Sequence, residues 1–217
     1  GRAVLLWDSG GKVKDCLFAK ANLAGVGDIK FLINLGQDAA GGLVTEVFER
    51  AMDKKALTEG TSATAAGIRR FRWTRISHLA LGGFEHSGLV MHEANENTIG
   101  LGLLSRYVVT MDFPSMKMYL QKGQAFDKPD EVDMSGLHLW RLEGRTVVHS
   151  VDKDSPAEVA GIKPEDVVLK VGEASATEMD IYDLRDLLKS GDGKEIRMTI
   201  KRGEEEKVVN FKLKKQI

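Results

Sequence analysis

The first 120 residues alternate between short apolar runs and turn-forming residues. The runs are rich in β-branched and large apolar side chains and are separated by glycine, aspartate and serine, which is typical of β-strands joined by tight turns. The predicted strands are Ala3–Trp7, Lys12–Ala21, Ile29–Leu35, Ile68–Leu81, Gly88–His92 and Tyr107–Phe113. Two short helices are predicted, at Leu43–Lys55, where apolar residues recur every three or four positions, and at Leu101–Arg106. The pattern predicts a small β domain over residues 1–120.

The pattern changes after residue 120. Residues 121–133 are polar with almost no apolar side chains, which indicates a linker between two domains. Residues 134–217 return to apolar runs, and two helices are predicted among them, one capped by Ser155 and followed by Pro156, the other capped by Thr177. The strands predicted around these helices are Thr146–Val151, Asp166–Val171, Lys194–Lys201 and Lys207–Leu213. The chain is therefore predicted to be mainly β, with two domains.

Composition and charge narrow the functional classes. The 31 basic and 32 acidic residues nearly balance, so the sequence lacks the electrostatic footprint of a nucleic-acid binder. No apolar run reaches the roughly 20 residues that span a bilayer. The single Cys16 excludes an internal disulfide, and the five histidines show no metal-ligand spacing, with His86 and His92 expected on exposed turns. We expect no metal or cofactor, and a chain that opens at Gly1 leaves any export signal open.

Several segments of the last part of the chain follow one another in a recognisable order. They are Ser135–Leu139, Val151–Ile162, Lys163–Val171 and Leu184–Leu188. In this order they resemble a PDZ domain of the kind found in bacterial envelope proteases, which implies a peptide-binding module in an exported bacterial protein. Glu165 departs from the family, which usually has glycine in that turn, so we expect the turn to adopt a backbone conformation that tolerates a side chain.

The PDZ resemblance implies a peptide groove. An extended peptide would add as a strand beside Leu137–Arg141, and its terminal carboxylate would accept hydrogen bonds from backbone N–H groups of residues 134–137, where Gly136 would permit a close approach. The last ligand side chain would enter an apolar pocket between the strand and the second helix. The predicted peptide-binding residues are Ser135, Gly136, Leu137, His138, Leu139, Ile181, Leu184 and Leu188. The alternative is that leucines such as Leu139 and Leu187 are ordinary core.

The first domain carries a second resemblance. Asn97–Pro114, preceded by Ile76–Phe84 and Ile29–Ile33, resembles retropepsin-like aspartic proteases, which implies a closed β domain over residues 1–120. At the end of the third segment the family has Asp-Thr-Gly, whereas this chain has Asn34, Leu35 and Gly36. The chemistry needs two carboxylates that share a proton, and an amide cannot accept the proton of water. A homodimer would present Asn34 twice, so the site is predicted to be inert.

Two other aspartates are candidate acids. Asp8 begins an Asp-Ser-Gly triplet after an apolar run, but several predicted strands separate it from Ile99. Asp38 lies four residues after Asn34, but it lacks the following hydroxyl residue and the glycine in its place. The sequence therefore leaves open whether the chain is an enzyme.

These observations favour a peptide- or protein-binding protein built from a degenerate aspartic-protease-like domain and a PDZ domain. The alternative is an active aspartic endopeptidase, either a homodimer or a chain with a second lobe, whose PDZ domain recruits substrate. A third reading is a dimerisation scaffold that associates through the retropepsin-like domain. The expected partner is an extended segment or C-terminus of another protein, with no nucleic acid.

Overall fold

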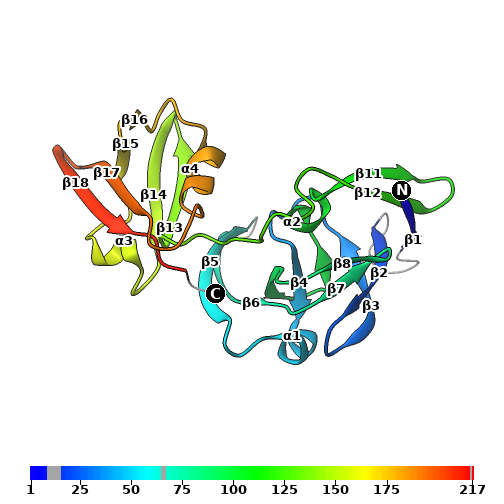
Figure 1. Cartoon of the computed structure of the whole chain (residues 1–217). Helices are drawn as coiled ribbons and strands as arrows, with labels where there is room; N and C mark the ends of the chain where they lie inside the picture. The colour runs from blue at the N-terminus through cyan, green and yellow to red at the C-terminus, as the bar shows by residue number, and fades with distance from the viewer. Residues whose placement is uncertain (9–15, 65–66, 216) are drawn as a thin grey trace. The chain divides into compact units, whose positions relative to one another are not determined.

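A computed structural model of the chain describes all residues except 9–15, 65–66 and 216, and gives the backbone alone for residues 7–8, 61–64 and 67–68. The described chain is mainly β, with 48% strand and 11% helix (Figure 1). It divides into two compact units, the first formed by residues 1–59, 71–130 and 217, the second by residues 60–70 and 131–216. No helix among the described residues is long and apolar enough to cross a membrane.

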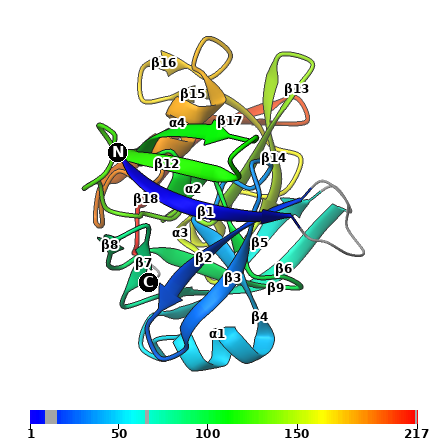
Figure 2. The same ribbon diagram turned by 90° about the vertical axis from the view of Figure 1, so that its right-hand side faces the viewer.

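The first sheet has twelve strands in the order β11-β12-β1-β2-β3-β10-β4-β9-β6-β5, and β7 joins it by pairing with β2 and β8. Its strands are β1 (Arg2–Asp8), β2 (Leu17–Leu23), β3 (Gly27–Ile33), β4 (Gly41–Val44), β5 (Leu57–Thr64), β6 (Gly67–Arg75), β7 (Leu79–Leu81), β8 (Phe84–His86), β9 (Val90–Ala94), β10 (Thr98–Ile99), β11 (Tyr107–Asp112) and β12 (Lys117–Lys122). Two short helices, α1 (Thr45–Ala51) and α2 (Leu101–Leu104), accompany them, and Figures 1 and 2 both place α1 near β4.

The prediction of a closed β domain is wrong. In the part of the chain that the structure describes, the strand order has two ends, at β11 and at β5. The hairpin of β11 and β12 pairs with β1, where Ala3 lies opposite Tyr119, and so extends that end of the sheet instead of returning to β5.

Most predicted strands are present with different bounds. The run predicted at Ile68–Leu81 is two strands, β6 and β7, and the helix predicted from Leu43 begins at Thr45 because Leu43 pairs with Glu93 in β4 and β9. Strand β12 was not predicted, although its alternation of buried Met118 and Leu120 with exposed residues is that of a half-buried strand. The predicted strand Lys12–Ala21 lies partly outside the described residues.

Part of the segment predicted as a linker packs on the first unit. Phe126 is 8% exposed and belongs to the hydrophobic core, where its ring contacts Phe84 and Tyr107. Asp130 accepts a hydrogen bond from the Val90 N–H at 2.7 Å and forms an ion pair with Arg106 at 3.7 Å. These contacts hold the chain on the first unit as far as residue 130.

Two histidines expected on exposed turns are part of the first unit's packing. His86 is 6% exposed and contacts the rings of Tyr107 and Phe126, and burial lowers the pKa of His86 to about 4. His92, on β9, is half-buried against the ring of Trp73, and burial lowers its pKa as well. The alternation of apolar and polar residues in the sequence around His86 and His92 did not indicate that aromatic side chains cover them.

The second unit is a six-stranded sheet in the order β13-β14-β15-β17-β18, with β16 paired to β15. Its elements are β13 (Leu137–Leu142), β14 (Arg145–Val151), α3 (Pro156–Val159), β15 (Val167–Val171), β16 (Ala174–Ser175), α4 (Ile181–Leu187), β17 (Glu195–Arg202) and β18 (Glu205–Lys212). Strands β13 and β18 are the two ends of this order, and α4 packs next to β13.

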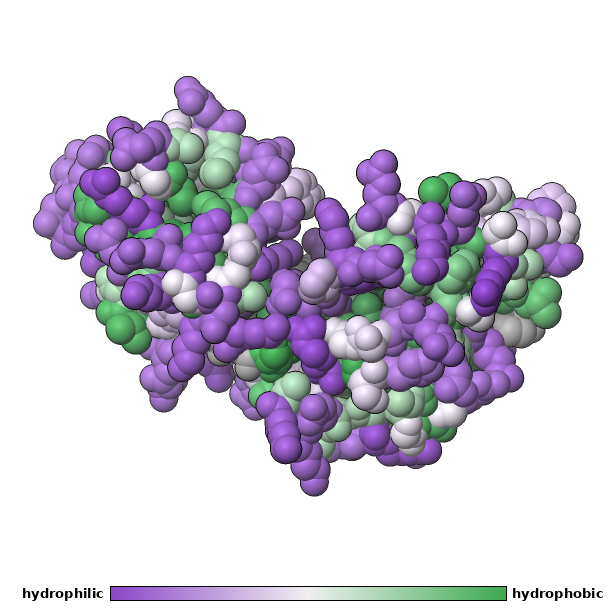
Figure 3. Space-filling view, viewed as in Figure 1, coloured by the Kyte–Doolittle hydropathy of each residue, from purple (hydrophilic) through white to green (hydrophobic). Residues whose placement is uncertain are grey.

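Figure 3 shows one face of the molecule, which is mainly hydrophilic, with hydrophobic residues in scattered areas.

The two predicted helix starts have different outcomes. The Ser155 cap is confirmed, because its hydroxyl oxygen accepts a hydrogen bond from the Glu158 N–H at 3.2 Å. The Thr177 cap is wrong: its hydroxyl lies 2.8 Å from that of Ser175, and α4 is capped by Asp180. Asp180 accepts a hydrogen bond from the N–H of Tyr182, two residues later.

Glu165 adopts the conformation that the sequence prediction excluded. Its φ is 73°, in the left-handed region that favours glycine, whereas we predicted a conformation that tolerates a side chain. The N–H of Glu165 donates to the carbonyl of Val148 at 2.8 Å, which fixes the turn before β15. A left-handed non-glycine residue costs about 1 kcal/mol, so this turn is strained.

Candidate functional site

Strand β13 lies at an end of the second sheet. It pairs with β14 from Leu137 opposite Val151 to Leu142 opposite Arg145, with an irregularity between His138 and Leu139. An edge strand presents backbone N–H and C=O groups that can pair with another chain. The edge of β13 beside α4 is therefore one of the two sheet edges of this unit, the other being β18, that could pair with an added strand (Figure 1).

Residues 133–137 form the loop that leads into β13, which we call the Asp133 loop. Most of its polar groups form hydrogen bonds with one another. Asp133 Oδ1 accepts hydrogen bonds from the Ser135 N–H at 2.8 Å, the Gly136 N–H at 2.6 Å and the Ser135 hydroxyl at 2.8 Å. The N–H of Leu137 donates to the Ser135 hydroxyl oxygen at 3.0 Å, and the N–H of Met134 donates to the Leu188 carbonyl at 3.0 Å. Each backbone donor predicted to receive a peptide carboxylate thus has an internal acceptor.

The Asp133 carboxyl lies in a setting where two effects oppose each other. Desolvation raises its pKa above the ordinary value, although the hydrogen bonds from Ser135 and Gly136 and the neighbouring His138 act to lower it. His138 Nε2 lies 3.0 Å from Asp152 Oδ1, so this predicted peptide-binding side chain is engaged with a carboxylate of its own unit.

Gly136 has a different role from the predicted one. Its φ is 77°, and a Cβ at this position would overlap the side chain of Ser155. The Gly136 carbonyl accepts a hydrogen bond from the Asp152 N–H at 2.8 Å, and the Ser135 carbonyl accepts one from the Ala157 N–H at 3.1 Å. Glycine is needed here because the loop packs on the start of α3, whereas the prediction assigned it to the close approach of a ligand.

The leucines predicted to line the apolar pocket are buried in the hydrophobic core. Leu137 and Leu139 are 5% and 3% exposed, and Leu184 and Leu188 are fully buried, all in the hydrophobic core of the second unit. Ile181 is half-buried and packs against that core. For the leucines the alternative interpretation, ordinary core, agrees with the structure.

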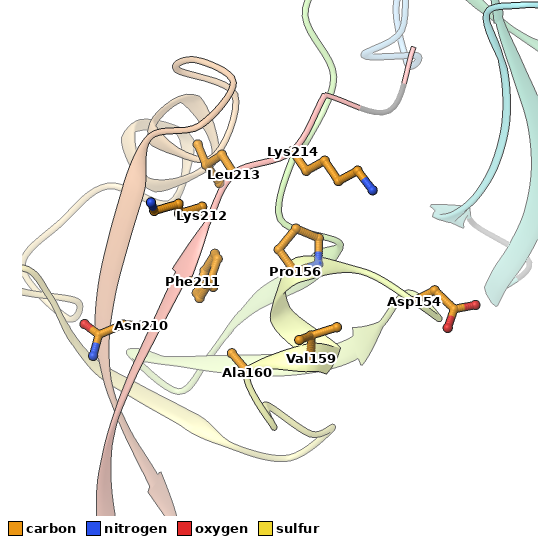
Figure 4. A pocket seen from close by; sticks show the side chains of 9 residues that line it. All are labelled: Asp154, Pro156, Val159, Ala160, Asn210, Phe211, Lys212, Leu213 and Lys214. Atoms are coloured by element: carbon orange, nitrogen blue, oxygen red, sulfur yellow. The ribbon is translucent and has the colours of Figure 1, made fainter.

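A hollow in the second unit lies away from this predicted groove, between α3 and β18. It is lined by Asp154, Pro156, Val159, Ala160 and residues 210–214, and Figure 4 shows these side chains around it. Since β13 and β18 are the two ends of the strand order, this hollow does not belong to the edge where a peptide would add to β13.

The sequence prediction missed Arg185. Its Nη2 donates to the carbonyl of Leu139 at 3.0 Å, which places the guanidinium on the strand that a peptide would join. The signal was present, because residue 185 follows Ile181 by four positions and precedes Leu188 by three, and therefore shares their helix face. A ligand N–H that paired with this carbonyl would compete with Arg185.

In the first unit, the loop of residues 34–37 follows β3; we call it the Asn34 loop. Strand β10 lies between β3, to which it is parallel, and β4, to which it is antiparallel, and the N–H of Asn34 donates to the Ile99 carbonyl at 2.9 Å. The Asn34 side-chain oxygen accepts a hydrogen bond from the Gly36 N–H at 3.1 Å, and Leu35 is 60% exposed. The structure therefore brings residues 34–36 beside β10.

The polar side chains around the Asn34 loop are amides, a hydroxyl and an imidazole. Gln37 Oε1 accepts a hydrogen bond from the Thr98 hydroxyl at 2.7 Å, and Gln37 Nε2 lies 2.7 Å from His92 Nε2. Asp38 is exposed at the surface. Asp8 ends β1, but its side chain and the Ser-Gly that follows it lie outside the described residues. Among the described residues no cluster of histidine, cysteine, aspartate and glutamate is arranged to hold a metal ion.

Comparison with known proteins identifies part of the second unit. Residues 147–202 match the family model of the PDZ domain. The chain contains a PDZ domain. Two curated relatives are the probable CtpA-like serine protease of Staphylococcus haemolyticus, 36% identical over 77 residues, and the carboxy-terminal processing protease CtpA of Bacillus subtilis, 27% identical over 104 residues. These matches cover 36% and 46% of this chain but only 16% and 22% of the relatives.

One solved structure is similar to part of the chain. It is a retropepsin-like aspartic protease from Rickettsia conorii, with 18% identity and a TM-score of 0.38 over 55% of this chain and 89% of that chain. A likeness of this size assigns no part of the chain to a family.

Proposed function

We propose that this protein binds extended peptide segments through its PDZ domain, which adds them as a strand along the edge of β13 beside α4. The observation that carries the proposal is the position of β13 at the end of its sheet, next to a helix, in a unit that matches the PDZ family. Backbone pairing gives affinity with little demand on ligand sequence, which suits a domain that presents unfolded or extended chains to another part of a protein.

The test of this proposal is a comparison of two charge substitutions on α4. Ile181 is half-buried next to the strand, whereas Tyr182 is 66% exposed on another face of the same helix. We expect Ile181→Glu to abolish capture of a random peptide library by the whole chain and Tyr182→Glu to preserve it, with both variants folded by circular dichroism. Equal capture by both variants would move the site away from β13.

The finer part of the proposal is that the first unit is a noncatalytic lobe resembling an aspartic protease. Its support is the arrangement of β3, β10 and the Asn34 loop, with an amide at the position where the chemistry needs a carboxylate. The curated relatives are named as a CtpA-like serine protease and a carboxy-terminal processing protease, but this chain spans less than a quarter of their length, so their activity is not part of the proposal.

The noncatalytic character is tested by incubating the purified chain with an unstructured protein substrate from pH 3 to pH 8. We expect no cleavage. Cleavage that a pepstatin-type inhibitor abolishes would instead support the alternative, an aspartic endopeptidase with PDZ recruitment, and Asp38→Asn would then show whether the exposed Asp38 supplies the acid.

Self-association through the first unit is a second candidate function. Leu35 and Leu101 are 60% and 38% exposed, and the N–H of Leu101 donates to the carbonyl of Gln37 in the Asn34 loop. Two exposed leucines beside one loop favour a contact with a second copy of the chain. Sedimentation at high concentration tests this, with a monomer of 23.8 kDa as the result that contradicts it.

A further inference from the structure

The Asp133 loop already holds a carboxylate in the arrangement that a peptide terminus requires. Two consecutive backbone N–H groups and one hydroxyl donate to a single oxygen of Asp133. Converging backbone donors of this kind are how proteins capture a terminal carboxylate. In this chain the captured group comes from the loop itself.

We propose that Asp133 is a specificity-determining residue of the peptide groove, because its carboxylate holds the place of a ligand's terminal carboxylate. The groove then accepts strands from within a polypeptide and discriminates against free C-termini. This inference rests on the proposed peptide-binding function and names the class of ligand that it serves.

Charge and hydrogen bonding both support this selectivity. A free C-terminus at the Asp133 loop would bring a second negative charge beside Asp133 and would find the N–H groups of Ser135, Gly136 and Leu137 already engaged. Such a repulsive element is a common way to reject a wrong ligand. An internal segment brings no terminal charge, and it needs only the edge of β13.

Contacts with other segments of the second unit also hold the Asp133 loop in this conformation. The Met134 N–H donates to the Leu188 carbonyl at the end of α4, and the Met134 carbonyl accepts a hydrogen bond from the Lys214 N–H at 2.9 Å. Gly136 packs against the side chain of Ser155. A ligand carboxylate therefore cannot gain the donors by a small rotation of the loop, and it must displace Asp133.

The experiment compares peptides of one sequence in three forms: a free C-terminal acid, a C-terminal amide and a form extended by several residues beyond that point. Binding to the whole chain is measured by calorimetry. We expect the natural protein to bind the acid no more tightly than the amide or the extended form. In Asp133→Ala the emptied donors should favour the acid by about tenfold, since hydrogen bonds to a charged group are the strong ones.

Two control variants distinguish the effect of freeing the hydrogen-bond donors that Asp133 occupies from the effect of removing a negative charge. Asp133→Asn keeps a side-chain oxygen for the donors, and Asp152→Asn removes a carboxylate close to the loop without emptying it. Neither should acquire the preference for the free acid. A tenfold preference in Asp152→Asn equal to that in Asp133→Ala would show that net charge, not the filled loop, sets the selectivity.

The outcomes distinguish this inference from the proposed function. If the natural protein already prefers the free acid tenfold, the role of Asp133 is overturned and peptide binding stands. If no form binds any variant, peptide binding fails, and a second measurement decides the role of Asp133. N-acetyl-leucine should shift the N–H resonances of Ser135, Gly136 and Leu137 in Asp133→Ala but not in the natural protein; equal shifts in both would overturn the inference.

Discussion

The Asn34 loop and the Asp133 loop begin with the same local structure and end in different surroundings. In each, the first side chain accepts a hydrogen bond from the backbone N–H two residues later, at Gly36 in one loop and at Ser135 in the other. Leu35 beside the first bond is 60% exposed, whereas Ser135 is fully buried. Water can replace the first bond but not the second, so one local motif gives an exposed turn in the first unit and a fixed site in the second.

The strongest test of this comparison substitutes the glycine of each loop. Gly136→Ala places a Cβ against Ser155 and forces a side chain into a left-handed conformation, so we expect it to destabilise the second unit by about 3 kcal/mol. Gly36→Ala meets only the Asn34 side chain at 3.5 Å, an ordinary contact, and should change stability by less than about 0.5 kcal/mol. Urea unfolding, followed separately for each unit by hydrogen exchange, measures both. Similar losses in the two variants would show that the loops are equally constrained.

The next test removes the capping side chain itself. Asp133→Ala leaves the Ser135 N–H, the Gly136 N–H and the Ser135 hydroxyl without their acceptor, and we expect a loss of about 2 kcal/mol. Asn34→Ala leaves one exposed N–H, with an expected loss of at most about 0.5 kcal/mol. The same unfolding measurement applies, and Asp133→Asn, which keeps the oxygen, serves as the matched control. If Asp133→Asn lost as much as Asp133→Ala, the charge and not the acceptor would hold the loop.

The sequence predicted the features that depend on neighbouring residues along the chain. Ser155, Pro156 and Glu158 announce a helix start by local hydrogen bonding, and that start is confirmed. Asp133 followed by Ser135 and Gly136 was the same kind of local signal, typical of a side chain that caps its own turn, but the PDZ resemblance directed attention to the donors and not to the residue before them.

The features that were not predicted depend on contacts between distant segments. The burial of Leu184 and Leu188, the packing of Phe126 on the first unit and the open ends of the first sheet all result from tertiary packing. A periodic apolar face shows which side of a helix is covered, but not whether a core or a ligand covers it. For this reason Leu137, Leu139, Leu184 and Leu188 were predicted to line a ligand pocket.

The folding stability of the two units should change with pH in opposite directions. The unfolded chain protonates His86 near pH 6.5, but the folded first unit does so only near pH 4, so stability should fall by about 1.4 kcal/mol per pH unit as the pH drops between these values. Asp133 has a raised pKa in the folded state, so the folded second unit binds a proton at a higher pH than the unfolded chain does. The stability of the second unit should therefore rise as the pH drops through this range. Hydrogen exchange of each unit between pH 7 and pH 4 measures the two trends. His86→Phe should flatten the first trend and Asp133→Asn the second; unchanged slopes would assign them to other groups.

The smallest expected effect extends the comparison from the loops to backbone strain in the two units. Among the described residues, left-handed conformations without glycine occur at Met116 in the first unit and at Glu143, Asp154 and Glu165 in the second. Glu165→Gly should stabilise the second unit by up to about 1 kcal/mol, because it removes the steric cost of the left-handed conformation while the Val148 hydrogen bond stays. Met116→Gly, the matched change in the first unit, should give a similar gain, less the burial that its half-buried side chain contributes. Thermal unfolding resolves the difference, and a loss of stability in Glu165→Gly would mean that the Glu165 side chain contributes more to this turn than its backbone strain takes away.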